Sequence, residues 1–111
     1  MLCKDWRISR GKEYRFIYNN GRKIIGKYMI LFLSENQLTY NRFGIVTSKK
    51  TGNAVIRNRA KRQIREVIRK NLKNLQPGYD IVVVARYNIK DAIFDLIESD
   101  FLKLMRKASI K

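Results

Sequence analysis

Residues 48–70 read SKKTGNAVIRNRAKRQIREVIRK, and this stretch is the most informative part of the sequence. It holds nine basic residues and a single acid, Glu66. Its apolar side chains recur at helical spacing, so that one face packs on a core: Ile56, Ala60, Ile64, Val67 and Ile68. The pattern predicts a rigid helix over residues 54–74, capped by Asn53 or Thr51, that presents cations on its other face.

The polar residues of this helix divide into two groups at 100° per residue. Arg57 and Lys61 fall inside or beside the apolar arc, where unpaired burial would cost several kcal/mol. We therefore expect the first turns to overhang the sheet, so that Arg57, Lys61 and Arg65 line a groove. The helix N-terminus adds its partial positive charge beside Lys49 and Lys50. The second group forms a polar stripe opposite the apolar arc: Asn58, Arg62, Arg65 and Arg69.

The composition indicates a folded protein that binds a polyanion. The 111 residues carry 25 Lys and Arg against 9 Asp and Glu, a net charge of +16, with 45% apolar residues. This length suits one domain, 1–111, with residues 1–9 as an N-terminal arm. Solvated helices usually mix Glu with Lys or Arg, whereas the basic helix has only Glu66. The planar guanidinium group of arginine can donate two hydrogen bonds to phosphate oxygens. RNA or DNA is therefore the leading partner, and an anionic membrane surface is a third candidate.

The chain before this helix supplies three elements. A helix over 10–20, with Ser9 as its N-cap, ends before Gly21. Residues 22–34 are extended and break near Gly26. A strand over 40–48 should pair with the preceding strand as an antiparallel hairpin.

Two more elements follow the basic helix. The unbroken apolar run in 79–86 predicts a strand that is buried on both faces and central in its sheet. Asn88 and Asp91 resemble a capping pair for a last helix over 89–107. The sum is an α/β two-layer sandwich in which a small sheet is covered by helices.

No active site carried by the protein is visible in the sequence. The chain has no histidine, and Cys3 is its only cysteine, which excludes an internal disulfide and a cysteine zinc site. Asp91, Asp95 and Glu98 share one face of the last helix, but a solvated face explains them better than a metal site. No apolar run is long enough to span a bilayer or to form a signal peptide, so we expect a cytoplasmic protein.

Aromatic residues gather in the first half of the chain, and exposed ones could stack unpaired bases. They are Tyr14, Phe16, Tyr18, Tyr28 and Phe32. For Tyr14 and Tyr18 the helical spacing by itself favours packing in the core.

The run SKKTGNAVIRNRAKR, residues 48–62, resembles the motif of the protein component of bacterial ribonuclease P. The similarity extends to Glu13-Tyr14 with Tyr18 and Gly21, to Phe43–Val46, and to Tyr79–Arg86. It implies an αβββαβα order with a left-handed βαβ crossover around the motif helix, against the usual right-handed rule.

The resemblance also implies a function. The holoenzyme of the family removes the 5′ leader from precursor tRNA. Its RNA subunit is the catalyst and uses a divalent metal, expected to be Mg²⁺. The protein alone is expected to bind no cofactor. The protein would bind this RNA and the single-stranded leader, which lies in a cleft lined by Tyr14, Tyr18 and Phe32. The choice of Phe32 over Tyr28 depends on strand register. The RNA contacts implied are Lys49, Lys50, Arg57, Asn58, Arg59, Lys61, Arg62, Arg65 and Arg69.

Two other functions fit the residues. A ribosomal protein or assembly factor would use the same basic face for purely structural RNA binding. A membrane-surface binder is the weaker alternative, because the sheet needs the apolar arc of the basic helix.

Overall fold

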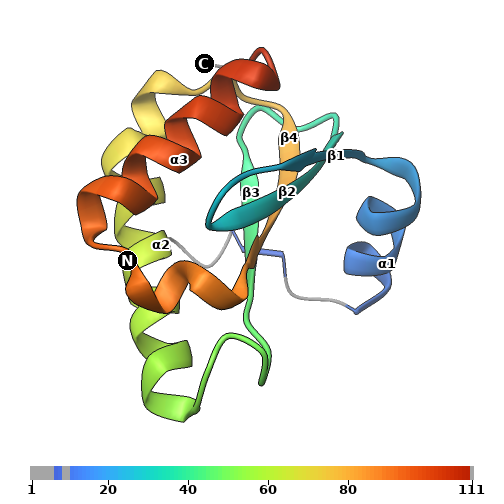
Figure 1. Cartoon of the computed structure of the whole chain (residues 1–111). Helices are drawn as coiled ribbons and strands as arrows, with labels where there is room; N and C mark the ends of the chain where they lie inside the picture. The colour runs from blue at the N-terminus through green and yellow to red at the C-terminus, as the bar shows by residue number, and fades with distance from the viewer. Residues whose placement is uncertain (1–6, 9–10, 111) are drawn as a thin grey trace.

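A computed structural model describes residues 7–8 and 11–110, which form a four-stranded sheet with helices on both faces (Figure 1). Helices α2 and α3 cover one face and α1 covers the other, which confirms the α/β sandwich and its αβββαβα order. The predicted cap Ser9 and the cysteine Cys3 lie outside the described residues. The elements are α1 (Gly11–Asn20), β1 (Arg22–Ile25), β2 (Met29–Glu35), β3 (Arg42–Val46), α2 (Ala54–Asn71), the 3₁₀ turn η2 (Leu72–Asn74), β4 (Tyr79–Ala85), the 3₁₀ turn η3 (Tyr87–Asp91) and α3 (Phe94–Lys107).

The antiparallel hairpin predicted between the extended stretch 22–34 and the strand 40–48 is wrong. The sheet order is β1-β2-β4-β3, so β4 lies between β2 and β3 and is an inner strand, as predicted. The loop after β2 is tied to the turn before β4: Asn36 N donates to Gly78 O, and Asn41 Nδ2 donates to Gln76 O, both at 2.9 Å. These bonds hold the loop after β2 against the end of β4. The chain then enters β3 on the other side of β4, so β2 and β3 are not neighbours and cannot form a hairpin.

Strands β3 and β4 are parallel, and α2 joins them in a βαβ unit. The hairpin that does form is β1–β2, which pairs antiparallel with Lys23 opposite Phe32. Its turn begins at Gly26, where the extended stretch breaks. Glycine fits this turn because a Cβ there would lie 2.8 Å from Asp100 Oδ2. The handedness of the crossover stays a prediction from the family.

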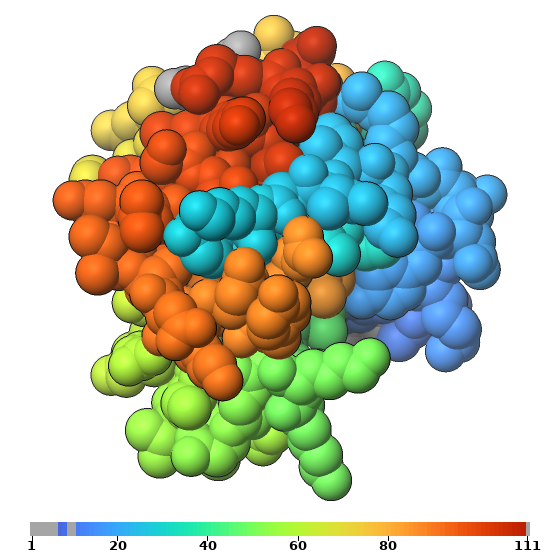
Figure 2. Space-filling model, in the orientation of Figure 1, coloured from blue at the N-terminus to red at the C-terminus, as the bar shows by residue number. Residues whose placement is uncertain are grey.

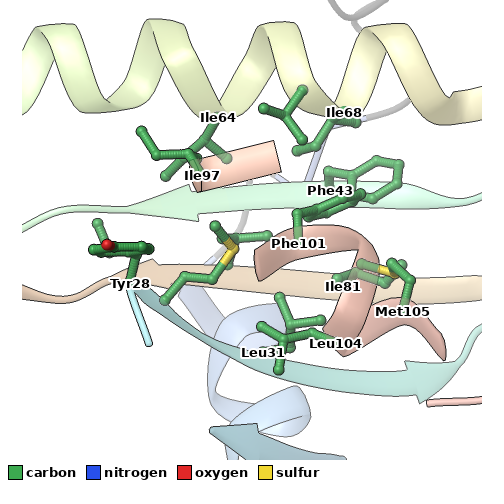
Figure 3. Packing of buried hydrophobic residues seen from close by; sticks show 14 of the residues in the cluster. Tyr28, Leu31, Phe43, Ile64, Ile68, Ile81, Ile97, Phe101, Leu104 and Met105 are labelled. Atoms are coloured by element: carbon green, nitrogen blue, oxygen red, sulfur yellow. The ribbon is translucent and has the colours of Figure 1, made fainter. Parts of the chain in front are cut away.

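The main core lies between the sheet and the α2–α3 layer. Ile64 and Ile68 of α2 pack with Phe101 of α3 against Phe43 and Ile81 of the sheet (Figure 3). All five side chains are at most 1% exposed. The apolar face predicted for α2 is therefore the face that holds this helix on the sheet.

The other face of the sheet has a much smaller core. Ile17 of α1 is buried there with Ile8 and Val82, while Phe32 and Val46 are only partly buried. Helix α1 thus covers part of this face and leaves the rest accessible. This opening is the structural basis of the cleft described below.

The last helix starts five residues later than predicted, at Phe94 instead of 89. Ile89 and Ala92 are buried, and Ala92 N donates to Ile89 O, which holds this segment in a 3₁₀ turn. Asn88 therefore does not cap α3, whose N-cap position is Ile93. The later start also leaves Ile93, just before the helix, largely exposed.

Candidate nucleic-acid interface

Helix α2 begins at an exposed basic loop. Asn53 is its cap, since its Oδ1 accepts from Ile56 N at 3.0 Å, whereas Thr51 is buried and Ser48 N donates to its hydroxyl. The first turn of α2 holds no acid, so the partial positive charge of the helix N-terminus is not neutralised there. The loop between β3 and α2, green in Figure 2, projects from the body of the molecule and carries Lys49 and Lys50, both exposed.

The outer face of the first turns of α2 is polar and accessible. Asn58, Arg59 and Arg62 are exposed, as the polar stripe requires. Arg59 Nη2 donates to the carbonyl oxygen of Lys90 at 2.8 Å, which directs this guanidinium toward η3. The acceptor is a neutral backbone carbonyl, which leaves the positive charge of Arg59 available to an anion.

Acidic partners neutralise the far end of the same helix. Both guanidinium nitrogens of Arg69 that face Glu66 donate to its carboxylate, with Arg69 Nε 3.0 Å from Glu66 Oε2. These hydrogen bonds lower the pKa of Glu66 and raise the pKa of Arg69. Lys70 Nζ lies 3.3 Å from Glu98 Oε1. The unpaired basic surface of α2 therefore ends near Arg65, one turn earlier than the sequence pattern indicates.

Lys61 and Arg65 lie on the inner side of α2, where they line a cavity of about 130 Å³. Tyr14 of α1 and Gly44 of β3 line the same cavity, which opens at the edge of β3. Arg57 lies apart from it, since its Nη1 donates to Gly52 O at 3.2 Å. The predicted groove thus exists, but Lys61 and Arg65 form its cationic wall and Arg57 supports the loop before the helix.

The three aromatic residues named by the resemblance lie together. The ring centroids of Tyr14 and Tyr18 are 6.5 Å apart, and those of Tyr18 and Phe32 are 4.8 Å apart at an interplanar angle of 82°. Tyr18 is 38% exposed, whereas Tyr28 is buried in the main core on the opposite face. Lys23 Nζ lies 5.8 Å from the Phe32 centroid. Phe32, and not Tyr28, therefore lies beside Tyr18 and Tyr14 on this face of the sheet.

A charged network that the sequence analysis missed fastens α1 to the sheet. Arg42 Nη1 lies 2.9 Å from Glu13 Oε2, while its Nε and Nη2 donate to the two oxygens of Asp80 at 2.8 and 2.6 Å. The bonds to Asp80 raise the pKa of the Arg42 guanidinium. The sequence does hold one sign of this network, since Asp80 is an acid within an otherwise apolar strand. A carboxylate buried in such a strand requires a cation as its partner.

The acids of the last third of the chain do not converge on a metal site. Asp91 and Asp95 are exposed, as predicted, but Glu98 accepts from Lys70 and Asn71. Asp100 is buried and accepts from the backbone nitrogens of the β1–β2 turn. Within residues 7–8 and 11–110, no three metal-ligating side chains of the His, Cys, Asp or Glu type cluster together.

A model of the family described as Ribonuclease P matches residues 2–109 of the chain. The chain belongs to the ribonuclease P protein family. The ribonuclease P protein component of Syntrophomonas wolfei subsp. wolfei is 42% identical over 110 residues, which cover 99% of this chain and 92% of the relative. That of Clostridium botulinum strain Langeland is 40% identical over 108 residues, covering 96% and 97%.

Solved ribonuclease P proteins have the same fold. The Staphylococcus aureus protein superimposes with a TM-score of 0.87 at 30% identity, covering 95% of this chain and 96% of that one. The Thermotoga maritima protein gives a TM-score of 0.84 at 28% identity, covering 91% and 96%. The agreement extends over nearly the whole of each chain, so the fold described above is that of the family.

Membership in the family decides between the functions left open by the residues. Ribonuclease P is an endoribonuclease of tRNA 5′ maturation, and this chain is its protein subunit, a partner of the ribonuclease P RNA. A ribosomal protein or a membrane-surface binder is therefore set aside. Among the residues that the structure describes, no helix is both long and apolar enough to cross a membrane.

Proposed function

We propose that this subunit holds the single-stranded 5′ leader of precursor tRNA in the cleft between α1 and α2, and binds the catalytic RNA through the exposed start of α2. The observation that carries the proposal is the shared cavity of Lys61, Arg65 and Tyr14. Two cations and an aromatic ring that line one cavity match what an unpaired nucleotide offers, namely a phosphate and a base.

The aromatic surface of Tyr14, Tyr18 and Phe32 suits a leader of any sequence. Every base has a flat face that can stack on an exposed ring, and stacking contributes about 1–3 kcal/mol per base. Tyr18 exposes the most surface of the three rings, and it touches both of the others. The leader can therefore be held along the cleft without readout of its sequence.

The outer cations of α2 suit the folded RNA subunit. The exposed set extends from the loop before the helix to its third turn: Lys49, Lys50, Asn58, Arg59 and Arg62. The four basic side chains would neutralise phosphates of the catalytic RNA and reduce the repulsion between that RNA and the leader, while the Asn58 amide could donate a hydrogen bond. Less repulsion means that fewer divalent ions are needed, so the protein would lower the Mg²⁺ requirement of the holoenzyme. We also propose that this reaction takes place in the cytoplasm.

Reconstitution with the cognate ribonuclease P RNA tests the proposal. Cleavage of precursor tRNA is measured at limiting Mg²⁺, with and without the protein, for substrates that carry or lack a leader extension. The proposal predicts faster cleavage and tighter binding of the leader-bearing substrate when the protein is present, with a strong dependence on salt. An unchanged rate at limiting Mg²⁺ would refute it.

A further inference from the structure

The short segment before α1 forms part of the cleft. Ile8 N donates to Phe43 O at 2.9 Å, and Arg7 pairs with Phe43 in a parallel bridge, so both residues lie along the outer edge of β3. The Ile8 side chain is 4% exposed and packs with Ile17 and Val82 in the small core beneath α1. Residues 7 and 8 are therefore fixed to the body of the protein.

The hydroxyl of Tyr14 fastens this segment to α1. Tyr14 Oη donates to the carbonyl oxygen of Ile8 at 3.1 Å. Burial, assisted by the neighbouring Tyr18 and Glu13, raises the pKa of Tyr14, so the hydroxyl keeps the proton that it donates. Phenylalanine at this position would keep the ring in the cleft and lose only this bond.

Arg7 adds a third cation to the cavity that Lys61 and Arg65 line. None of the described residues that line the cavity carries a carboxylate. Three positive charges around a space of about 130 Å³ repel one another, and an anion placed among them converts that repulsion into attraction. The planar fork of arginine is well suited to phosphate oxygens.

We infer that Arg7 binds a phosphate of the single-stranded leader, and that the Tyr14 hydroxyl positions Arg7 by holding residues 7–8 against α1. This inference rests on the proposed leader cleft and adds a cation from outside the basic helix. The leader backbone would pass between Arg7 on one side and Lys61 and Arg65 on the other. The base next to that phosphate would meet the Tyr14 ring.

The test uses the reconstituted holoenzyme with precursor tRNA and with mature tRNA, and compares Arg7→Gln, Tyr14→Phe and the double variant. Arg7→Gln should weaken precursor binding roughly fivefold, with no change for mature tRNA, and should reduce the salt slope for the leader by about 0.7. Tyr14→Phe should weaken it by a similar factor. The double variant should be no weaker than Arg7→Gln, because both changes remove the same contact.

Arg106→Gln, at the exposed last turn of α3, is the matched control for the loss of one surface charge and should leave precursor binding unchanged. If Arg7→Gln also has no effect while Lys61→Gln weakens precursor binding, the role of Arg7 is refuted and the leader cleft stands. If neither change matters, the cleft itself is refuted. If the effects of Arg7→Gln and Tyr14→Phe multiply, the hydroxyl does not act through Arg7.

Discussion

The ring of Tyr14 lies directly against the backbone of Gly44. A Cβ atom added at Gly44 would lie 2.4 Å from Tyr14 Oη and 2.7 Å from Tyr14 Cζ, both well inside van der Waals contact. Glycine at this position of β3 therefore lets α1 bring an aromatic ring down onto the sheet. The same ring lines the cavity that Lys61 and Arg65 share, so the shape of the cleft depends on the absence of a side chain at Gly44.

Gly44→Ala should move the Tyr14 ring out of its position. We expect a stability loss of about 1–3 kcal/mol from overpacking, and weaker binding of precursor tRNA with unchanged binding of mature tRNA. Urea denaturation and holoenzyme binding measure the two effects. Gly11→Ala is the matched control, because among the described residues the nearest side chain beyond the chain neighbours of Gly11 is that of Arg15, whose Nη1 would lie at an ordinary contact distance of 3.6 Å from a new Cβ. Equal effects from both substitutions would contradict the packing of Tyr14 on Gly44.

Arg42→Gln should destabilise the protein far more than an ordinary loss of one arginine. It would leave Asp80, whose side chain is 11% exposed, without the cation that bonds both its oxygens. We expect a loss of about 3 kcal/mol in the free energy of unfolding, measured in urea. Arg22→Gln removes a single bond from Arg22 Nη2 to Ala108 O and should cost about 1 kcal/mol. Similar losses for the two variants would contradict a special contribution of the Arg42–Asp80 pair to the free energy of unfolding.

Glu66→Gln should strengthen binding to the ribonuclease P RNA. The substitution releases Arg69 from its acidic partner and extends the basic surface of α2 by one turn. Affinity should rise severalfold and fall more steeply with salt, while the free energy of unfolding should hardly change because the pair is exposed. Glu35→Gln removes an equal charge at the end of β2. If it raises affinity as much, only the net charge matters.

The hydrogen bond from the Tyr14 hydroxyl should stabilise the folded protein less at alkaline pH, where the hydroxyl loses its proton. The folded pKa of Tyr14 lies above its ordinary value of 10.0, so its contribution is complete below pH 10 and is lost as pH rises through the folded pKa. Wild type should therefore exceed Tyr14→Phe in stability by a constant amount up to about pH 10, and the difference should shrink above it. A difference that is independent of pH would contradict the raised pKa.

The sequence predicts well the parts of this structure that local periodicity controls. The apolar face of α2, a cap at Asn53 or Thr51, the break at Gly26 and the buried inner strand β4 all follow from spacing and residue type. The position of β3 does not, because it is set by bonds from Asn36 and Asn41 to a turn that lies some 40 residues away along the chain. No local pattern could reveal those bonds.

The candidate site divides in the same way. Helical spacing identifies Lys61 and Arg65 as neighbours on one wall, and the resemblance supplies Tyr14, Tyr18 and Phe32. The roles of Arg7 and Gly44 depend on which strand lies at the edge of the sheet and on how closely α1 approaches it. These are tertiary facts, and so the cavity could be assembled only from the folded structure.

The most direct test of the leader cleft is the affinity of the holoenzyme for precursor tRNA as a function of leader length. With wild-type protein, affinity should rise over the first several leader nucleotides and then level off as the cleft fills. With Lys61→Gln/Arg65→Gln, the account predicts a much smaller rise of affinity with leader length, because only Arg7 and the aromatic rings remain, and unchanged binding of mature tRNA. An unchanged rise with leader length in that double variant would contradict the account.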